Sequence, residues 1–182
     1  KKKTKEGAFE EPRRIYQDIL VKFPKNKKAI DGLKGLAGKP VGKVSKVQDP
    51  PQYQQQSVIN LYNQGQFQQA LKQTTILLWD FPDSSVLYNI CGAVYKELSQ
   101  LDASIEAYKK ALSLQPNYAD AYNNMGNTLQ EQGKLEEAIE AYSKALALKP
   151  DDAEVYNNMG NTFKKQGKLE EAIEAYSKAL AL

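Results

Sequence analysis

The chain has 182 residues, of which 41% are apolar and 26% are charged, and it carries a net charge of +3 with one Cys and no His. Without imidazole there is no Ser/His/Asp or Cys/His relay and no His-ligated metal, and one thiol forms neither an internal disulfide nor a four-thiolate metal site. The longest apolar runs fall well short of the ~20 residues that cross a bilayer. We therefore expect a soluble, cytoplasmic protein without metal, cofactor or membrane contact.

The N-terminal end of the chain is basic. Residues 1–49 carry 14 Lys or Arg and 6 Asp or Glu, whereas the remainder carries 11 and 16. We interpret residues 1–37 as a degenerate basic helical repeat remnant, and residues 38–50, which are rich in Gly, Pro, Lys and Ser, as a linker. Only three aromatic residues interleave with these basic side chains, whereas binding of single-stranded nucleic acid needs stacking rings along a basic groove. Nucleic acid is therefore not an expected partner.

From residue 51 onward the sequence repeats with a period of 34 residues. Pro82, Pro116 and Pro150 stand at this spacing, and residues 119–148 and 153–182 differ at only five of thirty positions. A period of this length is typical of a solenoid, in which each repeat buries its apolar face against its neighbours. We divide this region into four units, residues 51–84, 85–118, 119–152 and 153–182.

Each unit has the apolar pattern of two helices separated by a short turn. In the third unit Tyr122, Met125 and Leu129 have helical spacing, and a second helical pattern follows Gly133. Gly133 favours the left-handed backbone that ends a helix, and Pro150 ends the second helix. The helices are predicted near residues 52–63, 67–80, 85–97, 101–114, 119–132, 135–148, 153–166 and 169–182.

Small residues recur where the two helices of a unit must approach closely. They are Gly92, Gly126 and Gly160 in the first helices and Ser104, Ala138 and Ala172 in the second helices. A larger side chain there would separate the helices, and the Tyr, Met and Leu residues fill the remaining core volume. We therefore interpret the Tyr and Met stripes as core and not as a cofactor site.

These positions resemble the tetratricopeptide repeat family. The family's pattern of aromatic, Leu-Gly, Tyr, Ala, aromatic, Ala and Pro is matched in the third unit by Tyr122, Met125, Gly126, Leu129, Ala138, Tyr142, Ala145 and Pro150. The resemblance implies an all-α fold, a right-handed superhelical solenoid of antiparallel helix pairs. It also implies a non-catalytic scaffold, in which the first helices line a concave groove that binds a protein or an extended peptide.

The candidate groove residues are amides and lysines on the first helices. Asn competes for backbone hydrogen bonds and costs about 0.5 kcal/mol relative to Ala inside a helix, so its repeated use there suggests a function. One carboxamide donates and accepts, and it can therefore bridge the N–H and C=O groups of an extended peptide. The candidates are Asn89, Asn123, Asn124, Asn127, Asn157, Asn158, Asn161, Lys164 and Lys165.

Two interpretations of the Asn residues stay open. The string Tyr-Asn-Asn-Met-Gly-Asn is similar to the repeat region of O-linked N-acetylglucosamine transferases, in which an asparagine ladder at the places of Asn124 and Asn158 holds the substrate backbone. That resemblance implies an alternative function, a substrate-recruiting arm of a larger transferase, although the ladder stops at Ile90 and Gln56 in the earlier units. In the second interpretation the Asn side chains cap helices, bond neighbouring turns or reflect recent duplication.

A further alternative is self-assembly through the ends of the repeats. Both ends of the chain fall inside a unit, so we expect a fragment of a longer array, and its last residues are the apolar Ala179–Leu182. Solenoids normally end in a helix with a polar outer face. We therefore expect end-to-end contact between copies at high concentration.

Catalysis is not expected. The pair Glu136 and Glu137, repeated as Glu170 and Glu171, lies in the first turns of helices, where carboxylates interact favourably with the helix dipole. Cys91 stands where the following units have Met, so we interpret it as a core thiol.

Overall fold

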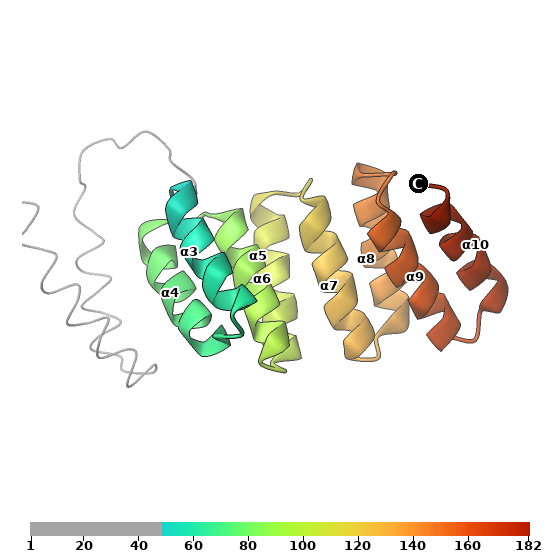
Figure 1. Ribbon diagram of the computed structural model, residues 1–182, viewed down its shortest axis with the longest axis horizontal. Coiled ribbons are helices and arrows are strands. Elements are labelled where there is room, and N and C mark those ends of the chain that lie inside the picture. The colour runs from blue at the N-terminus through green and yellow to red at the C-terminus, as the bar shows by residue number, and fades with distance from the viewer. Residues whose placement is uncertain (1–48) are drawn as a thin grey trace, which may run out of the picture. The chain divides into compact units, whose positions relative to one another are not determined.

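The computed structural model describes residues 49–182, and all regular structure within them is helical (Figure 1). The helices are α3 (Gln52–Asn63), α4 (Phe67–Asp80), α5 (Ser85–Glu97), α6 (Leu101–Leu114), α7 (Ala119–Glu131), α8 (Leu135–Leu148), α9 (Ala153–Lys165) and α10 (Leu169–Leu180). The chain divides into two parts between Val47 and Gln48, and the description below concerns the C-terminal part, which contains all four repeats. The predicted repeat remnant, residues 1–37, and all but the end of the predicted linker lie outside the described residues.

The eight predicted helices are confirmed, and the differences lie at their C-terminal ends. Helices α7 and α9 end one residue earlier than predicted and α10 ends two residues earlier. In α7 the cause is Gly133, whose φ of 81° turns the backbone to the left-handed region. The N–H of Lys134 then donates to the carbonyl oxygen of Leu129 at 2.9 Å. This bond satisfies a carbonyl at the end of the helix and fixes the turn into α8.

Each of the last three helix pairs closes by placing a Tyr ring on a Gly. A Cβ built on Gly126 would lie 2.6 Å from Cε1 of Tyr142, and Tyr142 is fully buried. The same arrangement joins Gly92 to Tyr108 and Gly160 to Tyr176. The predicted small residues of the second helices are buried as well. The close approach is confirmed, and its immediate cause is the ring that occupies the space above each Gly.

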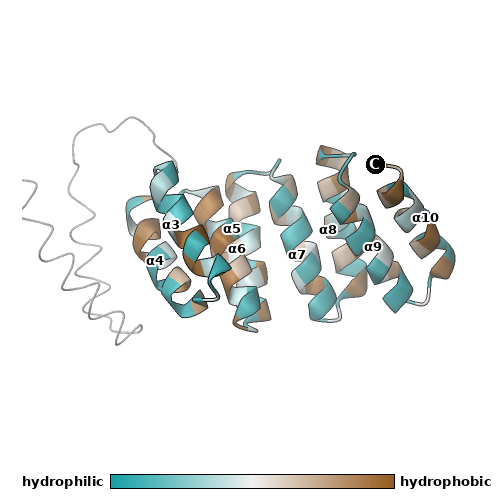
Figure 2. Ribbon diagram, viewed as in Figure 1, coloured by the Kyte–Doolittle hydropathy of each residue, from teal (hydrophilic) through white to brown (hydrophobic). Residues whose placement is uncertain are grey.

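The core runs along the stack between the helices. One cluster of buried residues joins α3, α4 and α5 and includes Val58, Leu77 and Leu87, and another joins α6, α7, α8 and α9 around Tyr142 and Val155. Figure 2 shows the corresponding alternation of apolar and polar stripes along each helix. None of the helices in residues 49–182 is long and apolar enough to cross a membrane.

The first helices of the pairs lie on the inner side of the stack. Helix α3 contacts α5, α5 contacts α7 and α7 contacts α9, whereas within residues 49–182 no two of α4, α6, α8 and α10 make contacts of similar extent. Successive first helices are therefore closer together than successive second helices, which curves the stack toward α3, α5, α7 and α9. These are the helices that carry the predicted groove residues.

Candidate functional site

Two hydrogen bonds link the predicted Asn residues of neighbouring repeats. Nδ2 of Asn124 donates to Oδ1 of Asn89 at 3.2 Å, and Nδ2 of Asn158 donates to Oδ1 of Asn123 at 3.1 Å. Both bonds join residues 35 apart, so the same connection recurs from α5 to α7 and from α7 to α9. We call the pairs Asn89–Asn124 and Asn123–Asn158 the amide rungs.

The rungs leave part of each carboxamide unused. Asn124 and Asn158 are half-buried, and each donates one of its two side-chain N–H bonds to the preceding repeat. Within residues 49–182 the side-chain oxygen of neither residue accepts a hydrogen bond. Each side chain is thus held in a fixed orientation while one acceptor and one donor remain for a ligand.

Asn89 and Asn123, the acceptors of the amide rungs, are themselves held by hydrogen bonds. Asn123 is only 9% exposed, and its amide donates to Oε1 of Glu154 at 3.4 Å. Asn89 is half-buried and donates to the hydroxyl oxygen of Tyr118 at 3.3 Å. Burial raises the pKa of Tyr118. Asn89 and Asn123 orient the two residues that follow them in the ladder.

Asn127 and Asn161 bind the tyrosines of the helix pairs. The hydroxyl of Tyr142 donates to Oδ1 of Asn127 at 2.8 Å, and the hydroxyl of Tyr176 donates to Oδ1 of Asn161 at the same distance. Burial raises the pKa of Tyr142, so this hydroxyl keeps its proton and remains a donor. Sequence reasoning assigned these two Asn residues to the groove and missed their bonds to Tyr, although the constant spacing of 15 residues carries that signal.

One of the two predicted lysines is bonded to a glutamine of the preceding repeat, and the other is not. Nζ of Lys165 donates to Oε1 of Gln130 at 3.0 Å. Gln130 in turn donates to Oγ1 of Thr162 at 2.6 Å, which connects α7 to α9. Lys164 and Asn157 are exposed. The structure thus brings Lys165 to the ladder through Gln130, while Lys164 and Asn157 face solvent.

The described residues contain no arrangement that suggests a metal site. Within residues 49–182 no group of three or more His, Cys, Asp or Glu residues lies close enough to hold a metal ion. Cys91 is buried, and burial raises the pKa of its thiol to about 12. A protonated, inaccessible thiol is a poor nucleophile.

Family comparison agrees with this architecture. A family model described as TPR repeat matches residues 92–133 and 126–167, and one described as Tetratricopeptide repeat matches residues 153–182. These matches together span residues 92–182, which is half of the chain. The chain therefore belongs to the tetratricopeptide repeat family. No curated protein matches the sequence.

Similar solved structures are available for the protein MamA. One MamA crystal structure is 24% identical, with a TM-score of 0.64 over 97% of this chain and 89% of that chain. The structure of MamA 41-end from Desulfovibrio magneticus RS-1 is 24% identical, with a TM-score of 0.66 over 96% of this chain and 94% of that chain. MamA AMB-1 is 19% identical, with a TM-score of 0.60 over 94% and 99%. At these identities the likeness shows the fold, and none of these matches supports the resemblance to O-linked N-acetylglucosamine transferases.

Proposed function

We propose that the chain is a non-catalytic scaffold that binds a protein segment or an extended peptide in the concave groove of its repeats. The groove comprises the amide rungs together with Asn127, Asn157, Asn161, Lys164 and Lys165. The observation that carries the proposal is the pair of oriented, partly unused carboxamides of Asn124 and Asn158 on neighbouring first helices. The family supports a role in protein binding.

The chemistry of the two carboxamides favours the backbone of a peptide as the ligand. An extended peptide offers N–H and C=O groups along its length, and a carboxamide has one partner for each. Because Asn124 and Asn158 are already held by Asn89 and Asn123, their side chains lose little rotamer freedom on binding. Such contacts fix the position of a peptide without selecting its side chains.

The experiment is a selection from a random peptide library on this chain, followed by measurement of each selected peptide on a variant with Asn124→Ala and Asn158→Ala. The proposal predicts that most selected peptides bind the variant at least about tenfold more weakly. The matched control is the pair Ser113→Ala and Ser177→Ala, two exposed residues of the outer helices that line neither the groove nor a pocket described below.

Two outcomes of this experiment would contradict different parts of the proposal. Peptides that bind the Asn variant and the Ser control equally would refute the amide groove as the site. If no peptide is selected at all, the peptide-binding function itself is contradicted. Circular dichroism of each variant establishes that the helices are intact.

A second candidate function is contact between copies of the chain. Helix α10 exposes apolar side chains, with Leu169 61%, Ile173 65% and Leu180 89% exposed. Exposed apolar surface of this kind favours association. Sedimentation equilibrium over a range of concentrations tests it: a mass that rises with concentration, and that falls in Ile173→Glu, supports the contact, and a constant monomer mass contradicts it.

A further inference from the structure

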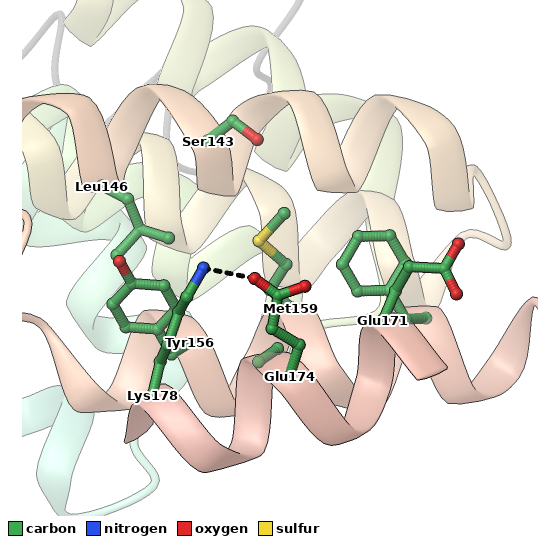
Figure 3. Close-up of a pocket in the computed structure, with 9 residues that line it drawn as sticks. Ser143, Leu146, Tyr156, Met159, Glu171, Glu174 and Lys178 are labelled. Atoms are coloured by element: carbon green, nitrogen blue, oxygen red, sulfur yellow. Dashed lines mark hydrogen bonds and ion pairs between the residues drawn. The ribbon is translucent and has the colours of Figure 1, made fainter. Parts of the chain in front are cut away.

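A second surface of interest is a pocket on the outer side of the last repeat. It has a volume of about 350 Å³ and is open to solvent. Figure 3 shows Ser143 and Leu146 of α8 on one wall, and Glu171, Glu174 and Lys178 of α10 on the other. Both walls and the floor belong to α8, α9 and α10, so the pocket is separate from the concave groove and goes beyond the proposed function.

The floor of the pocket is apolar and aromatic. Tyr156, Met159 and Phe163 of α9 form it, and all three are half-buried. Nζ of Lys178 lies 5.9 Å from the centre of the Tyr156 ring. A thioether and two rings make favourable contacts with another aromatic side chain. The floor therefore suits an aromatic anchor.

The rim of the pocket carries one unpaired acidic side chain. The charged residues that line it are Glu171, Glu174 and Lys178, and Lys178 is paired with Glu174 at 2.7 Å. Within residues 49–182 Glu171 has no cationic partner. This unpaired carboxylate complements a positively charged ligand.

The equivalent groove of the preceding repeat differs at two positions. The residue equivalent to Ser143 is Lys109, which would bring a cation to the rim. The residue equivalent to Phe163 is Leu129, which is only 4% exposed. The otherwise similar groove over α7 thus has a basic residue at its rim and a buried side chain in its floor.

We propose that this outer pocket docks a basic protein segment through one aromatic side chain flanked by Lys or Arg. The ring enters the pocket above Met159, and a flanking cation lies against Glu171. The binding mode combines an apolar anchor with a charged rim, which is the usual anatomy of a small docking site.

The two methionines of the chain provide the test. Methyl labelling of Met yields one resonance from Met159 in the pocket and one from its counterpart Met125 in the preceding repeat. The probes are a peptide with Phe between Arg and Lys residues, its Phe→Ser form, and a form with Glu in place of the basic residues. We expect the first peptide to shift the Met159 resonance and to leave Met125 unchanged, and the two control peptides to shift neither.

The proposal is overturned if no basic aromatic peptide shifts the Met159 resonance, if both methyl resonances shift equally, or if the Phe→Ser peptide acts as strongly. Titration of variants adds an independent check. Ser143→Trp fills the mouth of the pocket and is expected to weaken binding at least about tenfold, and Glu171→Lys several-fold. The matched controls, Ser177→Trp and Glu137→Lys, occupy the same helical positions in neighbouring units, and equal loss in a control would contradict the site.

Binding at the pocket is separable from binding in the groove. The variant with Asn124→Ala and Asn158→Ala is expected to retain the shift of Met159. If that variant loses the shift while its helices remain intact, the basic peptide binds in the groove and the outer pocket is not its site.

Discussion

Replacement of Ser99 by Gly is expected to stabilise the protein. Ser99 ends helix α5 with a φ of 57°, and it is the one non-glycine residue with positive φ in the part of the chain that the structure describes. The equivalent turns of the other units use Gly65, Gly133 and Gly167. The Ser99 side chain is exposed, so the substitution changes the backbone preference and little else.

The magnitude follows from two opposing terms. A side-chain-bearing residue in the left-handed region costs about 1–2 kcal/mol, whereas Gly loses about 0.5–1 kcal/mol more backbone entropy on folding. Ser99→Gly is therefore expected to raise the free energy of unfolding by about 0.5–1 kcal/mol. The reverse change, Gly133→Ser, is expected to lower it by a similar amount, since a Cβ on Gly133 would meet no atom within 4 Å.

Urea unfolding followed by far-ultraviolet circular dichroism measures both variants. The double variant is expected to return close to the original stability, because the two sites are one repeat apart and act independently. An unchanged or lowered stability of Ser99→Gly would refute the reasoning, as would a Gly133→Ser variant as stable as the original protein.

Further predictions concern the core. Gly126→Ala is expected to lower stability by about 1–2 kcal/mol despite the better helix propensity of Ala, because the new Cβ meets the Tyr142 ring; urea unfolding checks it, and a stabilised variant would contradict the contact. Tyr142→Phe removes the hydroxyl bond to Asn127 and is expected to cost about 1 kcal/mol, with a smaller loss for Tyr176→Phe, whose equivalent bond is exposed; equal losses would show that burial does not strengthen this bond. Burial raises the pKa of Cys91 to about 12. The contribution of the buried thiol to the free energy of unfolding is therefore fully present below the ordinary thiol pKa, and it is lost as pH rises from there to about 12. At neutral pH alkylation of Cys91 should be slow in the folded protein and fast in urea, and rapid alkylation of the folded chain would contradict its burial.

The helical architecture was predictable because the signals are local and repeated. Helical spacing, a Gly after three of the four first helices and a Pro between units each act within a few residues, and each signal recurs with the period. The positive φ of Ser99 was not predictable in this way, because the local preference of Ser opposes it and the neighbouring residues hold the turn. Its N–H donates to the carbonyl oxygen of Lys96 at 2.8 Å, which keeps the turn despite the missing Gly.

Helical spacing predicted which helices carry the candidate Asn residues, but not the bonds that those residues make. The Asn residues lie on the first helices, as expected. Helical spacing could not show that Asn123 is only 9% exposed, because burial depends on how α7 packs against α9. Nor could it separate Asn124, with its free oxygen, from Asn127, whose oxygen binds Tyr142. The outer pocket was not predictable from the sequence, because three helices line it.

The most direct test of the central claim is the affinity of selected peptides for the original chain and for the variant with Asn124→Ala and Asn158→Ala. The account predicts a loss of at least about tenfold for most peptides, with no loss in the variant carrying Ser113→Ala and Ser177→Ala. Equal binding to all three proteins, with intact helices, would contradict the claim that the oriented carboxamides of Asn124 and Asn158 form the ligand site.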